Sequence, residues 1–213
     1  IVENAANIKR HIIQNNIYGV DLERGAVDIA RLRLWLSLIV DEKSPEALPN
    51  LDFKIMQGNS LLEQYKGADL ATMTEKKVGG QGVTIFDSML DVYRKNLRDK
   101  LTEYYACPEH DKKVQLRKDI ADIVKKELSE QGINIDFGDI DMSANNQFFL
   151  WHTWFHDIFS RPSKEGFDIV IGNPPYGAKY DNETKRYYKN TYVTANSIRG
   201  LQKGSLDTYA LFI

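Results

Sequence analysis

Cysteine, proline and long apolar runs are scarce in this sequence of 213 residues. The single cysteine, Cys107, excludes an internal disulfide framework and a multi-cysteine zinc site, which fits a reducing, cytoplasmic setting. No apolar run reaches the ~18 residues that a membrane span requires, so no membrane partner is expected. The net charge of −2 excludes a generic polycation, and any nucleic-acid surface must therefore be a local patch.

What is present is the composition of a globular protein, with 42% apolar and 27% charged residues. Short apolar runs at residues 17–20, 53–56 and 167–171 predict strands, and residues 25–40 predict a buried helix. The alternation of strand and helix predicts an α/β fold with a mostly parallel sheet and helices on both faces.

Residues 63–147 differ in character from what surrounds them. A polar, glycine-containing stretch predicts a mobile loop, and two apolar stripes at helical spacing then follow, interrupted by Pro108 and ended by Gly132. The stripes consist of Phe86, Leu90, Tyr93, Leu97, Leu101 and Tyr104, and of Leu116, Ile120, Ile123 and Leu128. We therefore expect a helical insertion at 63–147 that divides one domain into a part at 1–62 and a part at 148–213. The mixed charge of its outer faces favours a solvated support over a binding role.

Polar residues follow each predicted strand, at the edge of the sheet where parallel sheets bind ligands. Asp21 ends the first strand, and its carboxylate suits ribose hydroxyls because it accepts both protons; an N-cap of the next helix is the alternative. Leu22 is placed to cover a flat adenine face. Asn59, in Gly58-Asn59-Ser60, carries an amide that suits an adenine amino group and ring nitrogen, although a turn residue is the alternative.

The segment Asn173-Pro174-Pro175-Tyr176 is the most specific signal in the chain. Two prolines fix the backbone and remove two N–H donors, which leaves a rigid corner of acceptors: the Asn173 side-chain oxygen and the Pro174 carbonyl. These acceptors suit the two hydrogens of an exocyclic amine and favour a nitrogen whose lone pair is free to attack a methyl donor. Tyr176 adds a flat aromatic face, and a plain diproline turn is the alternative.

The stretch after this corner is basic and rich in tyrosine. From Gly177 to Leu206 six basic residues outnumber two acidic ones, a local charge of +4. Such a patch suits phosphate contact and base stacking, and a solvated loop is the alternative. We expect DNA to be bound by four of these basic residues: Lys179, Lys185, Arg186 and Lys189.

Together these motifs resemble the N6-adenine-specific DNA methyltransferases of type II restriction–modification enzymes, in their large single-chain form. The resemblance implies a Rossmann-like methyltransferase fold, S-adenosylmethionine as cofactor and double-stranded DNA with a flipped-out adenine as substrate. It implies cofactor binding by Asp21, Leu22, Asn59 and Ser60. It also implies catalysis by the corner, in which Asn173 and Pro174 hold the N6 amino group and Tyr176 stacks on the adenine.

The family's glycine-rich cofactor loop and its target-recognition domain do not appear in the sequence. We therefore expect a fragment, inactive by itself, whose cofactor loop lies upstream of Ile1. His152 and His156 lack a third ligand nearby, and we expect no metal site in this segment.

Two other functions remain open. One is the same chemistry on a protein glutamine or an RNA guanine, although the long insertion argues against it. The other is a DNA-binding module without catalytic activity.

Overall fold

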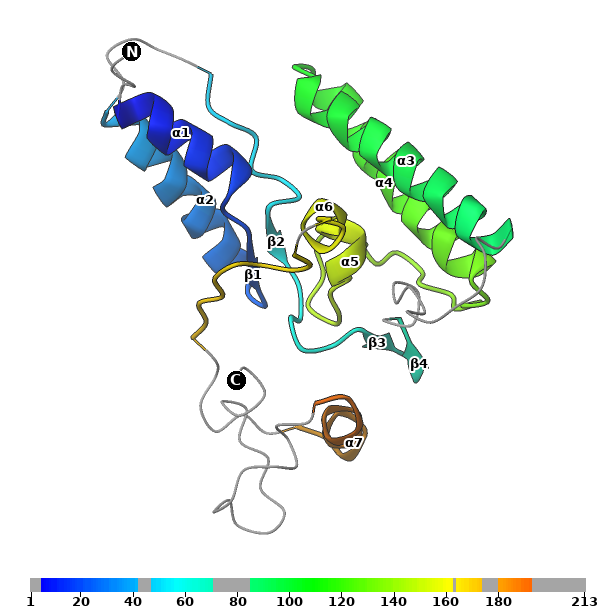
Figure 1. The fold of residues 1–213 in the computed structure, drawn as a ribbon. Helices are drawn as coiled ribbons and strands as arrows, with labels where there is room; N and C mark the ends of the chain where they lie inside the picture. The colour runs from blue at the N-terminus through cyan, green and yellow to red at the C-terminus, as the bar shows by residue number, and fades with distance from the viewer. Residues whose placement is uncertain (1–4, 42–46, 71–84, 163, 174–179, 193–213) are drawn as a thin grey trace, which may run out of the picture. The chain divides into compact units, whose positions relative to one another are not determined.

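The computed structural model describes residues 5–41, 47–70, 85–162, 164–173 and 180–192 (Figure 1). Contacts divide the chain into two compact units, Ile1–Asp157 and Ile158–Ile213, and each is described by itself. The predicted subdivision at residues 62 and 147 stays a prediction.

The first unit begins with helix α1 (Ala5–Asn15), strand β1 (Gly19–Asp21), helix α2 (Arg24–Ile39) and strand β2 (Ile55–Gln57). β1 and β2 pair in parallel, with Gly19 opposite Ile55 and Asp21 opposite Gln57. The first two strands and the helix between them are thus where the sequence predicted them, whereas α1 was not predicted. The fold is α/β with a small parallel sheet; over the described residues, β1 and β2 are its only paired parallel strands.

Helix α2 is less buried than its apolar composition predicted. Val27 and Leu38 are buried, together with Ile13, Leu51 and Ile55 of the neighbouring elements. The opposite side of α2 is exposed, and the main contacts of this helix are with α1, β1 and β2. The apolar residues on the exposed side are Ile29, Leu32, Leu36 and Ile39.

A short hairpin occupies part of the region predicted to be a loop. Strands β3 (Gln64–Tyr65) and β4 (Ala68–Asp69) pair antiparallel across Lys66 and Gly67. Both turn residues have positive φ, 48° and 79°, which is the requirement of a type I′ turn. Gly67 meets this requirement without strain. The prediction of an unstructured loop was therefore wrong over residues 64–69.

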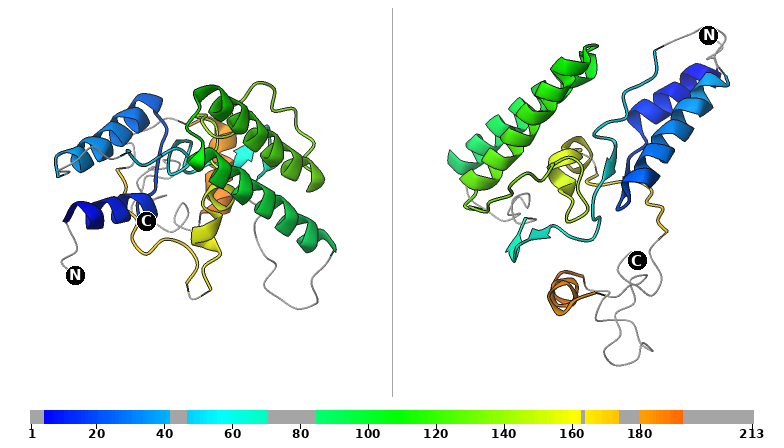
Figure 2. Two further views of the ribbon diagram at one scale, coloured as in Figure 1. Left: turned by 90° about the horizontal axis from the view of Figure 1, so that it is seen from above. Right: turned by 180° about the vertical axis from the view of Figure 1, so that it is seen from behind.

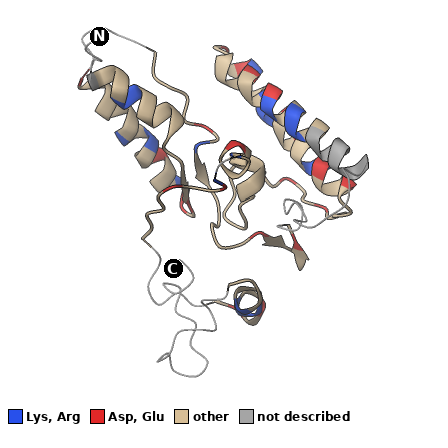
Figure 3. Ribbon diagram, viewed as in Figure 1, with Lys and Arg blue, Asp and Glu red and all other residues tan. Residues whose placement is uncertain are grey.

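The predicted helical hairpin is present as a pair of antiparallel helices, α3 (Ile85–Ala106) and α4 (His110–Glu130), which run side by side (Figures 1 and 2). That the hairpin is inserted into a single domain stays a prediction. Leu97 and Tyr104 of α3 are buried, as the spacing predicted. In α4 the buried residues include Val124 in place of the partly exposed Ile123. Gly132 has a φ of 87° and follows the end of α4, as expected for a left-handed helix terminus. Figure 3 shows basic and acidic residues interspersed along both helices.

The aromatic run after the insertion forms two single-turn helices, α5 (Trp151–Trp154) and α6 (His156–Phe159). Its rings pack on one another and on Tyr18, just before β1: the Phe149 and Trp151 centroids are 4.9 Å apart, and those of Tyr18 and Phe155 are 5.0 Å apart. None of the described helices is both long and apolar enough to cross a membrane.

The second unit does not form the predicted third strand. Residues 167–171 are in no strand, and Ile169, Val170 and Ile171 are 79%, 80% and 91% exposed. The prediction of a buried strand was wrong here, because no described segment pairs with this one and a strand is stable only when its backbone groups are paired. Helix α7 (Asn182–Thr191) follows. The predicted helix beginning at Asp207 lies outside the described residues.

Candidate functional site

The carboxyl ends of β1 and β2 lie beside each other. The ladder continues one step past the strands, since the Gly58 N–H donates to the Asp21 carbonyl at 2.9 Å. The Gln57 side chain donates to the Leu22 carbonyl at 3.1 Å. These bonds bring together the two loops that carry the predicted cofactor residues, Asp21-Leu22 and Asn59-Ser60.

Asp21 lies on the open side of this edge. It is exposed, and its Oδ1 accepts a hydrogen bond of 2.8 Å from the Glu23 N–H, just before α2 begins. The N-cap of α2 is Glu23, so Asp21 is not the helix N-cap that the sequence offered as its alternative role, and this turn uses only one of its two oxygens. Oδ2 accepts no hydrogen bond from the described residues. Leu22 is 46% exposed, so its apolar side chain is available to a ligand.

The loop after β2 rests on the aromatic run. A side-chain carbon at Gly58 would lie 2.3 Å from the Phe149 ring, so only glycine lets the two segments approach this closely. The Asn59 N–H donates to the Phe148 carbonyl at 3.4 Å, and the Trp151 indole donates to the Ser60 carbonyl at 3.0 Å. The Asn59 side chain, half-buried, accepts a bond of 3.3 Å from the Leu61 N–H. The backbone of the predicted cofactor loop is thus fixed on a rigid aromatic base.

Glu63 lies directly behind this loop and was not singled out from the sequence. Its carboxylate accepts a hydrogen bond of 2.9 Å from the Trp151 N–H, at the start of α5. Burial raises the pKa of Glu63 to about 7, against the opposing effect of that bond. A sequence signal was lacking because the two partners are 88 positions apart.

A second polar cluster lies where the loop before β2 meets the helical insertion. Asp52 forms ion pairs with Arg31 of α2 at 2.9 Å and Arg117 of α4 at 3.4 Å, and it accepts a bond of 2.6 Å from the Tyr104 hydroxyl. Burial, followed by the bond to Asp52, raises the pKa of Tyr104. This carboxylate therefore ties the insertion to the parallel strands.

The predicted catalytic corner is described only at its first residue. Asn173 is exposed and belongs to the second unit, which is described by itself. Pro174, Pro175 and Tyr176 lie outside the described residues, as does Lys179. The structure therefore brings together the four predicted cofactor residues and leaves the position of the corner a prediction.

Helix α7 carries the three remaining residues of the predicted DNA surface. Lys185 and Lys189 lie one turn apart with Arg186 beside them, and Arg186 and Lys189 are exposed. Tyr188, the buried residue of this helix, packs edge-on against Tyr180, with the ring centroids 5.1 Å apart. Among the described residues, no cluster of His, Cys, Asp or Glu is arranged to hold a metal ion.

Comparison with known proteins gives this geometry a context. Residues 15–213 match a family described as Eco57I restriction-modification methylase. This chain belongs to the Eco57I restriction-modification methylase family. The matched residues include both strand ends, the two helices α3 and α4, and α7. The prediction of a restriction–modification methyltransferase, made from the sequence motifs, is therefore confirmed at the level of the family.

One curated relative of this Eco57I-family chain is described as a putative type II restriction enzyme and methyltransferase of Methanocaldococcus jannaschii. The two are 27% identical over 232 aligned positions, which cover 79% of this chain. The chain spans 18% of the length of that relative. No solved structure matches the chain.

Proposed function

We propose that this chain is part of a DNA methyltransferase that transfers a methyl group from S-adenosylmethionine to the N6 amino group of adenine, within a restriction–modification system. The observation that carries the proposal is the family match over residues 15–213. The name of the relative, which combines a restriction enzyme with a methyltransferase, agrees with it. The parallel β1–α2–β2 unit also suits a Rossmann-like methyltransferase sheet, of which we propose it forms a part.

The strand ends suit the adenosine half of S-adenosylmethionine. A ribose needs hydrogen-bond acceptors, and Asp21 keeps its Oδ2 unused by the described residues at an exposed position. An adenine face needs apolar cover, which Leu22 offers at 46% exposure. Asn59 and Ser60 follow β2 beside them and would contact the adenine edge. The cofactor supplies an activated methyl group when bound.

The Asn173-Pro174-Pro175-Tyr176 corner would hold the substrate amine. The Asn173 side-chain oxygen and the Pro174 carbonyl accept its two N–H groups and leave the nitrogen lone pair directed at the methyl carbon. The nitrogen held in this way would accept the activated methyl group of S-adenosylmethionine, which Asp21, Leu22, Asn59 and Ser60 would hold, and the cofactor would leave as the neutral thioether. The methylated amine then loses a proton to solvent. Positioning and fixed dipoles, rather than a general base, would supply the catalysis.

The target adenine must leave the duplex to reach this corner. Tyr176 would stack on the extruded base, because unstacking is compensated when an aromatic ring replaces the lost neighbour. Lys179, Lys185, Arg186 and Lys189 would contact the phosphate backbone nearby. The α7 face of three basic residues supports this assignment.

The test is methyl transfer by the full-length protein with labelled S-adenosylmethionine and duplex DNA. Asn173→Ala should abolish transfer while leaving DNA binding largely intact. Asn146→Ala, a change at an exposed asparagine of the first unit, is the matched control and should transfer at the wild-type rate. Digestion and mass spectrometry of the product should yield N6-methyladenine. Transfer to RNA or protein alone, or undiminished transfer by Asn173→Ala, would contradict the proposal.

A further inference from the structure

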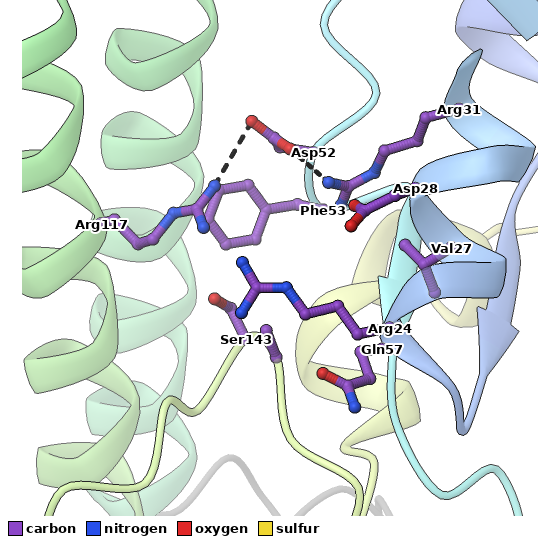
Figure 4. A pocket seen from close by; sticks show the side chains of 10 residues that line it. Arg24, Val27, Asp28, Arg31, Asp52, Phe53, Gln57, Arg117 and Ser143 are labelled. Atoms are coloured by element: carbon purple, nitrogen blue, oxygen red, sulfur yellow. Dashed lines mark ion pairs between the residues drawn. The ribbon is translucent and has the colours of Figure 1, made fainter.

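An open pocket with a cavity volume of about 40 Å³ lies beside the strand ends, within the first unit (Figure 4). Its walls come from α2, the loop before β2, α4 and the segment that returns from the insertion. Gln57, the last residue of β2, lines it, so the pocket adjoins the predicted cofactor edge. Its charged residues are Arg24, Asp28, Arg31, Asp52 and Arg117.

The charges of this pocket do not balance. Three arginines face two aspartates, a formal excess of one positive charge. Asp52 is shared between Arg31 and Arg117. Arg31 is further occupied by the Ile55 carbonyl, to which it donates at 2.9 Å and 2.5 Å. Each of the three guanidinium nitrogens of Arg31 therefore has a partner within the fold.

Arg24 makes no comparable ion pair or hydrogen bond with the described residues. It is exposed at the start of α2 and forms no ion pair with any described carboxylate, including that of Asp28 one turn along the helix. Figure 4 shows its guanidinium extending into the pocket, toward Arg117 and Ser143. A side chain with five donors thus ends in the pocket without an acceptor among the described residues.

Arg117 faces the same space with part of its donor set free. One terminal nitrogen bonds the Tyr104 hydroxyl at 3.0 Å and pairs with Asp52. Its guanidinium carbon lies 5.9 Å from the centroid of the Phe53 ring and 5.8 Å from that of Tyr104, which fixes its orientation. The remaining N–H groups have no hydrogen-bond partner among the described residues.

We propose that this pocket binds a phosphate group between Arg24 and Arg117. Two facing guanidinium groups repel each other unless an anion separates them, and phosphate oxygens match the donor geometry of arginine. We assign the phosphate to the backbone of the DNA substrate, and this source rests on the function proposed above. A free phosphate ester presents the same chemistry.

The experiment compares wild type, Arg24→Gln and Arg33→Gln in the full-length protein. Arg33 is the matched control because it is exposed on the same helix and does not line the pocket. The affinity for a duplex is measured over a range of salt concentrations. Arg24→Gln should weaken binding severalfold and reduce the salt slope by about 0.9, the value of one lost phosphate contact. Arg33→Gln should match wild type, and Arg24→Lys should recover part of the slope.

A second arm uses inorganic phosphate and pyrophosphate, with binding followed by calorimetry. If Arg24→Gln loses anion binding while Arg33→Gln keeps it, and the salt dependence of DNA affinity is unchanged in both, the pocket is supported and its ligand is a free phosphate ester. If Arg24→Gln behaves as Arg33→Gln in both arms, the proposal is overturned.

Neither arm depends on methyl transfer, so the pocket and the proposed function fail separately. A protein that methylates DNA but shows no dependence on Arg24 refutes the pocket alone.

Discussion

Gly58 offers the sharpest test of how the candidate cofactor loop is built. A Cβ at this position would lie 2.3 Å from Cδ2 of Phe149 and 2.9 Å from its Cβ and Cγ. Real Cβ atoms essentially never approach a neighbour this closely, so something must move. Phe149 is only 2% exposed and is packed against Trp151 and Phe155, which leaves its ring no space to retreat. We expect Gly58→Ala to lower the free energy of unfolding by about 1–3 kcal/mol.

Urea unfolding followed by tryptophan fluorescence measures this change, and an unchanged m-value would show that the unfolded state is unaffected. Gly25→Ala is the matched control. A Cβ at Gly25 would meet nothing within 4 Å, and the residue lies in helix α2, where alanine is favoured over glycine by about 0.5–1 kcal/mol. The two alanine variants should therefore shift the midpoint in opposite directions. If Gly58→Ala unfolds at the wild-type midpoint, the close approach of loop and ring is not a constraint and the reasoning is wrong.

Two further predictions concern single carboxylates. The pKa of Glu63 is raised from 4.5 to about 7, so its proton is bound more tightly in the folded state and stability should fall as pH rises between those values, by at most about 3 kcal/mol. Glu63→Gln should lose less stability between pH 5 and pH 8 in urea unfolding; an identical loss in both proteins would exclude Glu63 as the cause. Asp181 is the N-cap of α7, and its carboxylate accepts hydrogen bonds from both the N–H and the hydroxyl of Thr184. Asp181→Ala should speed amide exchange in the first turn of α7, and unchanged exchange at Thr184 would show that the cap is dispensable.

Local patterns predicted the elements whose stability is local. The two stripes of the insertion, at steps of three and four, gave the helical hairpin because each helix buries one face against the other. The strand ending at Asp21 and the helix after it were recognisable from apolar length. Asp21 and Asn59 were grouped correctly because parallel strands end at a common edge, and the pairing of Asp21 with Gln57 confirms that geometry.

The remainder depends on contacts between distant positions. The ion pairs of Asp52 with Arg31 and Arg117 join three segments that no short motif connects, and so the phosphate pocket was not foreseen. At residues 167–171 the sequence predicted a strand that the structure does not form. Their β-branched sequence favours a strand, but propensity alone does not form one when the backbone lacks a partner. The exposed face of α2 was also not predicted, because an apolar composition does not reveal how many neighbouring elements cover a helix.

The bond between the Trp151 indole and the Ser60 carbonyl gives the protein a built-in optical probe. An indole N–H held by a carbonyl emits at a wavelength that responds to nearby water and charge. A nucleoside settling beside Asn59 would change both, within one residue of that carbonyl. Within these 213 residues, replacing Trp35 and Trp154 with phenylalanine leaves Trp151 as the single tryptophan, whose emission would report occupancy of the strand ends without a label and before any chemistry takes place.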